Sequence, residues 1–191
     1  MNILILKTAS KQDDKKSLND SVIYELDGNN NIVAVNQLWQ SFALENNAPE
    51  LSHDSVIGKP LLQYISGNIT KRFWETFLEK VRLSNAVIHL NYRCDAPDLR
   101  RFMQIKAYRD ACDGLHFEST LLRTEPRSSS IYFKRSQQRS ADTKVRCSFC
   151  NHILYKNHWV EAESLVEGKH SVTLEVIYGI CPNCQGSLDA L

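Results

Sequence analysis

Two pairs of cysteines toward the C-terminal end are the residues of this sequence best suited to chemistry. Cys147 and Cys150 form one CxxC pair, Cys181 and Cys184 form another, and 30 residues separate them. Each pair can curl into a turn that presents two thiolates to one ion, and four thiolates match the tetrahedral preference of zinc. The spacing therefore predicts a closed, structural zinc site that stabilises a zinc-ribbon-like tail, residues 147–191, too small to fold on its own core.

Two alternatives to this zinc site remain open. The same thiols would serve a thiol–disulfide switch or an iron–sulfur cluster, although paired CxxC turns suit zinc better than the spacings usual for clusters. His152, His158 and His170 lie between the pairs, and any of them could replace a cysteine as ligand. Four cysteines already complete the shell, so exposed positions are the simpler interpretation of these histidines.

Large apolar residues in the N-terminal two thirds of the chain offer a second candidate site. They would line a pocket for a small ligand if their helices and strands enclose a cavity, and they would equally fill a dry core. Haem would need an axial ligand, but His89 and His116 fall on the polar faces of their strands. A flavin–thiol pair is weakly supported, because Cys94 and Cys112 lie at strand ends near turns. The pocket residues are Trp39, Phe42, Trp74, Phe77, Leu90, Tyr92, Met103 and Phe117.

Charged residues gather at one predicted turn. Arg93, Asp95, Asp98, Arg100 and Arg101 surround it. This pattern is typical of a solvated, ion-paired loop, and a docking surface is the alternative.

No enzyme motif is present: we find no glycine-rich phosphate loop, nucleophile elbow or His-Glu metal motif. We therefore expect no catalytic residues and no enzyme activity. Residues 124–146 are predicted as a basic linker with a helical turn around Ile131–Phe133. With Arg123 this segment carries seven Lys/Arg against two acids, so a zinc-ribbon protein that binds nucleic acid in transcription is an alternative.

The composition sets broad limits. The 191 residues are 42% hydrophobic and 24% charged, with a net charge of +1, which is typical of a globular protein with no general attraction to nucleic acid or membrane. The N-terminus lacks the features of a secretory signal, and no apolar stretch is long enough to span a bilayer. We expect a cytoplasmic protein whose cysteines stay reduced.

The periodicity of apolar residues predicts an α+β fold. Residues 1–20 form a flexible or helical lead-in. A β-hairpin follows, with strands at 22–26 and 32–35 around an Asn-rich turn. Helical spacing then predicts a helix from Asn36, a short one over 61–65 and a longer one over 70–83. Alternation predicts three more strands, and short turns make the five strands one antiparallel sheet with the helices on one face. Between the cysteine pairs we expect a hairpin of strands 159–166 and 172–177.

Residues 21–123 resemble a PAS domain. Leu26-Asp27-Gly28, Ile32–Asn36 and Ile57-Gly58-Lys59 look like its opening motifs, and the order of elements strengthens the resemblance. The tail resembles a cysteine-rich tail found behind PAS or receiver domains in bacterial signalling proteins.

The residues that match this tail are the four cysteines, Trp159, Glu161 or Glu163, and the run Gly179–Cys184, with Tyr178 where that pattern usually has histidine. The two resemblances imply a non-catalytic sensory or signal-transduction module. Its PAS-like domain would bind a small ligand or a protein partner, or form a homodimer. A redox or haem sensor is a further alternative.

Overall fold

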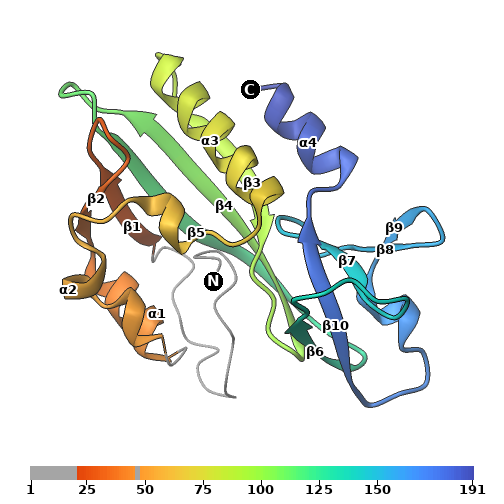
Figure 1. The fold of residues 1–191 in the computed structure, drawn as a ribbon. Coiled ribbons are helices and arrows are strands. Elements are labelled where there is room, and N and C mark those ends of the chain that lie inside the picture. The colour runs from red at the N-terminus through yellow and green to blue at the C-terminus, as the bar shows by residue number, and fades with distance from the viewer. Residues whose placement is uncertain (1–20, 46–47) are drawn as a thin grey trace.

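The computed structural model of the protein describes residues 21–45 and 48–191, and two β-sheets lie side by side in it (Figure 1). The first sheet has the order β2-β1-β5-β4-β3, and all of its neighbouring strands are antiparallel. The second has the order β6-β10-β7-β8-β9. The predicted lead-in, residues 1–20, lies outside the described residues. Among the helices of the described ranges, none has the length and apolarity needed to cross a bilayer.

The predicted hairpin and first helix are confirmed. Strand β1 (Ser21–Leu26) pairs with β2 (Ile32–Val35), and the Asp27 carboxylate accepts hydrogen bonds from the backbone N–H groups of Asn29 and Asn31 in the turn. Asn36 caps α1 (Gln37–Glu45), because its Oδ1 accepts a hydrogen bond from the Trp39 backbone N–H at 3.0 Å.

Helices cover one face of the first sheet (Figure 1). The 3₁₀ turn η1 (Pro49–Leu51) and α2 (His53–Val56) follow α1, and η2 (Leu61–Tyr64) lies where a short helix is predicted. The long helix is α3 (Asn68–Leu83), with Thr70, Phe73, Trp74, Phe77, Leu78 and Val81 on its buried face.

Three strands complete the first sheet: β3 (Ile88–Arg93), β4 (Leu99–Arg109) and β5 (Leu115–Pro126). Their alternation holds, since Leu90 is buried against the helices while His89 is exposed. The α+β class and the five-stranded antiparallel sheet with helices on one face are confirmed.

The second sheet corrects two expectations. Residues 131–133 are not a helical turn but part of β6 (Ser130–Arg135), as the alternation of buried Ile131 and exposed Tyr132 allows. Only β9 (His158–Val160) forms a strand in the run 159–166, and η3 (Ala162–Leu165) follows. Ala162, Leu165 and Val166 recur at the three-to-four spacing of a helical turn, which places them on one buried cluster.

The hairpin expected between the cysteine pairs, of strands 159–166 and 172–177, is wrong in its second strand. The hairpin that forms joins β8 (Ile153–Tyr155) to β9. Strand β10 (Ser171–Gly179) instead runs parallel to β6 and to β7 (Lys144–Cys147) and lies between them. The predicted linker 124–146 therefore contributes residues to both sheets, and α4 (Pro182–Asp189) ends the chain beside α3 (Figure 1).

One hydrophobic core joins the two parts of the molecule. The cluster between α3 and the first sheet also contains Cys147, Phe149, Cys181 and Leu188 from the tail. A smaller, separate cluster contains Ile131, Ile153 and Val176, which come from strands β6, β8 and β10 of the second sheet. The cysteine pairs are thus packed against the N-terminal domain.

Candidate metal centre and the interface around it

The first cysteine pair lies in a tight loop after β7. The Cys147 N–H donates to the His152 carbonyl at 2.8 Å, and the Asn151 N–H donates back to the Cys147 carbonyl at 3.1 Å. Asn151 has a φ of 65°, a left-handed conformation that asparagine tolerates better than most residues. The loop is closed by its own backbone, with both thiols turned to one side.

The second pair begins α4. Pro182 occupies the first helical turn, where its missing N–H costs nothing. Cys181 Sγ accepts a hydrogen bond from the Cys184 N–H at 3.4 Å, and the Cys181 N–H donates to Cys147 Sγ at 3.4 Å. These contacts bring the second pair directly against the first.

The four predicted ligands converge. Their Sγ atoms all lie within 4.8 Å of one another, and Cys150 Sγ is 3.6 Å from Cys181 Sγ. A disulfide would require about 2.05 Å, and all four are free thiols. Sulfurs about 2.3 Å from a tetrahedral ion would stand roughly 3.8 Å apart, so the donor set fits a metal ion coordinated by four sulfurs.

The thiols also perturb one another. The pKa of Cys147 is lowered because its sulfur accepts hydrogen bonds from Cys150, Cys181 and Cys184. Hydrogen bonding to the neighbouring sulfurs, with burial, raises the pKa of Cys150 and of Cys184. Four thiolates this close repel one another, so a cation is needed before all of them can be deprotonated together.

The loop of the first pair is held by the N-terminal domain at three successive points. Ser148 Oγ lies 2.8 Å from Thr70 Oγ1 of α3, with both residues buried. The Phe149 and Phe73 rings pack with their centroids 4.1 Å apart. The Phe149 backbone carbonyl accepts a hydrogen bond from the Arg93 backbone N–H at 2.7 Å.

The third point is Asn151, whose Nδ2 donates to the Arg93 carbonyl at 3.3 Å. Ser148, Phe149 and Asn151 are not singled out by the sequence-based prediction. The sequence does place an aromatic residue, Phe149, inside the loop of the predicted metal site, where exposure of its ring to water would be unfavourable.

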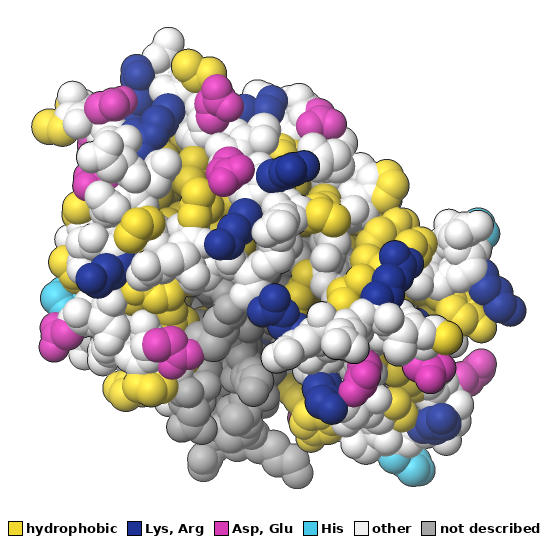
Figure 2. Space-filling model, viewed as in Figure 1, with side chains coloured by type: hydrophobic (Ala, Val, Ile, Leu, Met, Phe, Trp, Pro, Cys, Tyr) yellow, Lys and Arg dark blue, Asp and Glu magenta, His cyan; other side chains and the backbone are white. Residues whose placement is uncertain are grey.

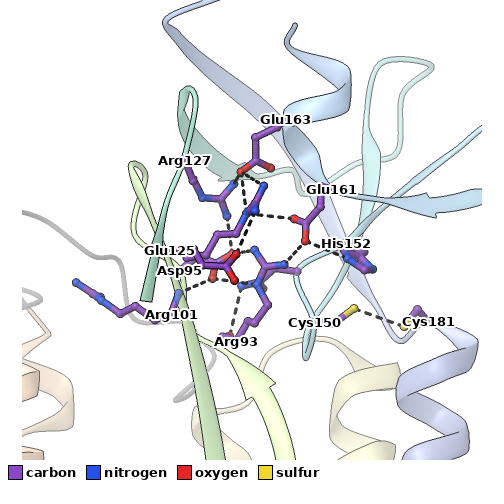
Figure 3. A network of polar contacts seen from close by, with 12 residues as sticks. Arg93, Asp95, Arg101, Glu125, Arg127, Cys150, His152, Glu161, Glu163 and Cys181 are labelled. Atoms are coloured by element: carbon purple, nitrogen blue, oxygen red, sulfur yellow. Dashed lines mark hydrogen bonds and ion pairs between the residues drawn. The ribbon is translucent and has the colours of Figure 1, made fainter. Parts of the chain in front are cut away.

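Beside the metal centre, a network of ion pairs joins the β3–β4 turn to the tail (Figure 3). The Arg93 guanidinium donates to Asp95 and to Glu161, each at 2.6 Å. Asp95 also accepts from Arg127, and both side chains are only 1% exposed. The predicted solvated loop is therefore wrong for Arg93 and Asp95, which are buried under the tail.

Glu161 and Glu163, one or the other of which matches the tail pattern, both lie in this network. The Glu163 carboxylate forms ion pairs with Arg100 at 2.8 Å and with Arg127 at 3.1 Å. Glu161 Oε1 accepts a hydrogen bond from the Arg93 guanidinium and lies 3.2 Å from His152 Nε2. Burial raises the pKa of Glu161, but the hydrogen bonds from His152 and Arg93 outweigh it and lower that pKa to about 2. Glu161 is thus a carboxylate at any physiological pH.

The eight predicted pocket residues all belong to the core or pack against it. Six are buried, while Phe42 and Met103 are partly buried. Several have partners inside the protein: Trp39 Nε1 donates to the Leu51 carbonyl at 2.8 Å, and Tyr92 Oη lies 2.6 Å from Ser119 Oγ. Their use as a ligand pocket stays a prediction.

The histidines considered as haem ligands lie on the sheet face away from the core. His89 is exposed beside Gln104, and His116 lies 3.2 Å from Glu25. Cys94 is buried and Cys112 is exposed. Burial raises the pKa of the Cys94 thiol to about 11, so this cysteine stays protonated.

The basic segment does not form one exposed strip. Arg127 and Arg146 are buried, and Lys134 pairs with Glu175 at 3.0 Å. On the face shown in Figure 2, cationic and anionic side chains are interspersed.

Comparisons with known proteins give little further information. The chain matches no family model and no curated protein. Among solved structures it is similar to a sensory box sensor histidine kinase from Vibrio cholerae, with 7% identity and a TM-score of 0.41 over 55% of this chain and 83% of that one. A likeness this weak identifies neither the fold nor the function.

Proposed function

We propose that this protein is a non-catalytic sensory module of bacterial signal transduction in the cytoplasm. Its N-terminal domain, residues 21–123, is PAS-like and binds a small ligand or a protein partner, which includes a second copy of the chain. Its tail carries a structural zinc ion on Cys147, Cys150, Cys181 and Cys184. The convergence of the four sulfurs against the core of the N-terminal domain supports the metal site. The order of elements and the antiparallel five-stranded sheet with helices on one face support the PAS-like part of the proposal.

Zinc is the metal that the donor set favours. Four sulfur ligands in paired turns are the usual tetrahedral shell of structural zinc, whereas Mg²⁺ and Ca²⁺ prefer oxygen. Such a shell leaves no position for water or substrate, so the ion would stabilise the fold and would not perform a reaction. The residues around the four cysteines supply packing contacts and hydrogen bonds that hold the two pairs in place.

Metal analysis after mild chelation tests this proposal. We expect one zinc ion per chain in protein purified under reducing conditions, and loss of that ion in Cys181→Ser. Cys112→Ser is the matched control, because Cys112 is an exposed thiol outside the cluster. A chain without zinc whose tail is unaffected by the chelator would contradict the proposal.

Binding to nucleic acid is the less favoured function, since part of the basic segment is buried or paired. If it were the function, affinity for DNA or RNA would fall with salt and with neutralisation of Lys134, Arg135 and Arg139. An absorbance spectrum of the isolated protein tests the remaining alternative, because haem and iron–sulfur clusters are coloured.

A further inference from the structure

In the loop of the first cysteine pair, residues 147–151, the cysteines and the other residues contact different parts of the molecule. The two cysteines of the loop face the other pair, while the residues between and after them face the N-terminal domain. Ser148, Phe149 and Asn151 contact Thr70, Phe73 and Arg93, respectively. Every non-cysteine residue from 148 to 151 therefore has a partner outside the tail.

The second pair reaches the same helix by another route. Leu188 of α4 is fully buried in the core that α3 lines, and Lys80 Nζ of α3 donates to the Asp189 carbonyl at 3.2 Å. Both cysteine pairs are thus positioned against α3, one through the loop and one through α4. The loop contacts α3 near its start, at Thr70 and Phe73, and α4 contacts it near its end, at Lys80, so a bend or rotation of α3 would change the relative placement of the two pairs.

We infer that α3 and the end of β3 position the metal centre, so that metal affinity and the conformation of α3 are thermodynamically coupled. Thr70, Phe73 and Arg93 act as positioning residues that never touch the ion. This inference rests on the proposed metal site and deepens it. Such coupling is reciprocal. If a ligand or partner that moves α3 weakens zinc binding by some factor, then bound zinc weakens the binding of that ligand or partner by the same factor.

The hydrogen bond between Thr70 and Ser148 allows a direct test with a matched control. In the 191-residue chain, Thr70→Val removes one hydroxyl at nearly constant volume, and Thr70→Ser keeps that hydroxyl. Thr120→Val removes the same group from a similar pair, Thr120 Oγ1 to Ser21 Oγ at 2.6 Å, which joins β5 to β1 away from the cysteines. Zinc affinity would be measured by competition with a chromophoric chelator.

The inference predicts that Thr70→Val binds zinc roughly 2- to 10-fold more weakly, the range that corresponds to the usual net contribution of one hydrogen bond. Thr70→Ser and Thr120→Val should bind like the wild type. Equal affinity in all four proteins, or equal weakening in both valine variants, overturns the inference while the metal site stands. Failure of the wild type to bind zinc overturns both.

Hydrogen exchange measured on the same 191-residue chain gives a second test. Adding zinc to metal-free protein should slow exchange of the α3 amides between Phe73 and Val81, as well as in the tail, while α1 changes little. Protection confined to residues 147–184 would show that zinc stabilises only the tail, and this result would refute the coupling.

Discussion

Truncation of Phe149 should destabilise the whole protein and not the tail alone. This ring is 1% exposed and lies 4.1 Å from Phe73 and 6.1 Å from Trp74, measured between ring centroids. Phe→Ala in a core costs about 3–5 kcal/mol of unfolding free energy, against a total of roughly 5–15 kcal/mol for a typical protein. For a chain of this size the melting temperature should fall by about 6–20 °C.

Urea denaturation of the metal-bound protein measures this cost. Far-UV circular dichroism follows the whole chain, and exchange-protected amides in α3 report on the N-terminal domain. Phe149→Leu should recover most of the stability, because it keeps an apolar side chain in the site. Tyr155→Ala is the control, since Tyr155 is 41% exposed, and should cost about 0.5 kcal/mol or less. A cost below about 1 kcal/mol for Phe149→Ala, or a separate tail transition that alone shifts, would refute the shared core.

Three further predictions concern charge and protons. Asp95→Asn leaves Arg93 and Arg127 without their shared buried carboxylate, so denaturation should show a loss of about 3–5 kcal/mol, whereas Glu175→Gln at the exposed pair with Lys134 should cost under about 1 kcal/mol. Because the folded pKa of Glu161 is lowered from 4.5 to about 2, its contribution is complete above pH 4.5 and lost as pH falls through 2. With its side chain 31% exposed, we expect about 1 kcal/mol, and an acid titration in which Glu161→Gln keeps the same slope as wild type would contradict this. Since the raised pKa values of Cys150 and Cys184 keep them protonated without metal, zinc binding should release protons and tighten as pH rises; calorimetry in buffers of different ionisation enthalpy measures the release, and none at neutral pH would be contradictory.

Local signals predict much of this fold. The Asn-rich turn, the cap at Asn36 and the two-residue alternation around Leu90 each depend on neighbours in sequence, and the structure confirms the elements they predict. Each CxxC pair is similarly local, and the hypothesis of one shared ion is what predicts that the two pairs converge. These features need no knowledge of distant partners.

Features set by distant contacts could not be predicted in the same way. The alternation of Ile131 is compatible with a strand, but nothing nearby in sequence reveals that β6 runs parallel to β10, some 40 residues later in the chain. Arg93 and Asp95 read as solvated charges until Glu161 and Arg127 cover them. Phe149 could be recognised as out of place in an exposed loop, but its partner Phe73 could not.

Native mass spectrometry of the 191-residue chain, purified under reducing conditions, tests the metal centre most directly. We predict the mass of one chain plus one zinc ion, less the protons that the ion displaces, and loss of that increment in Cys181→Ser but not in Cys112→Ser. A folded wild-type chain with no bound metal, or with the same increment in Cys181→Ser, would contradict the account.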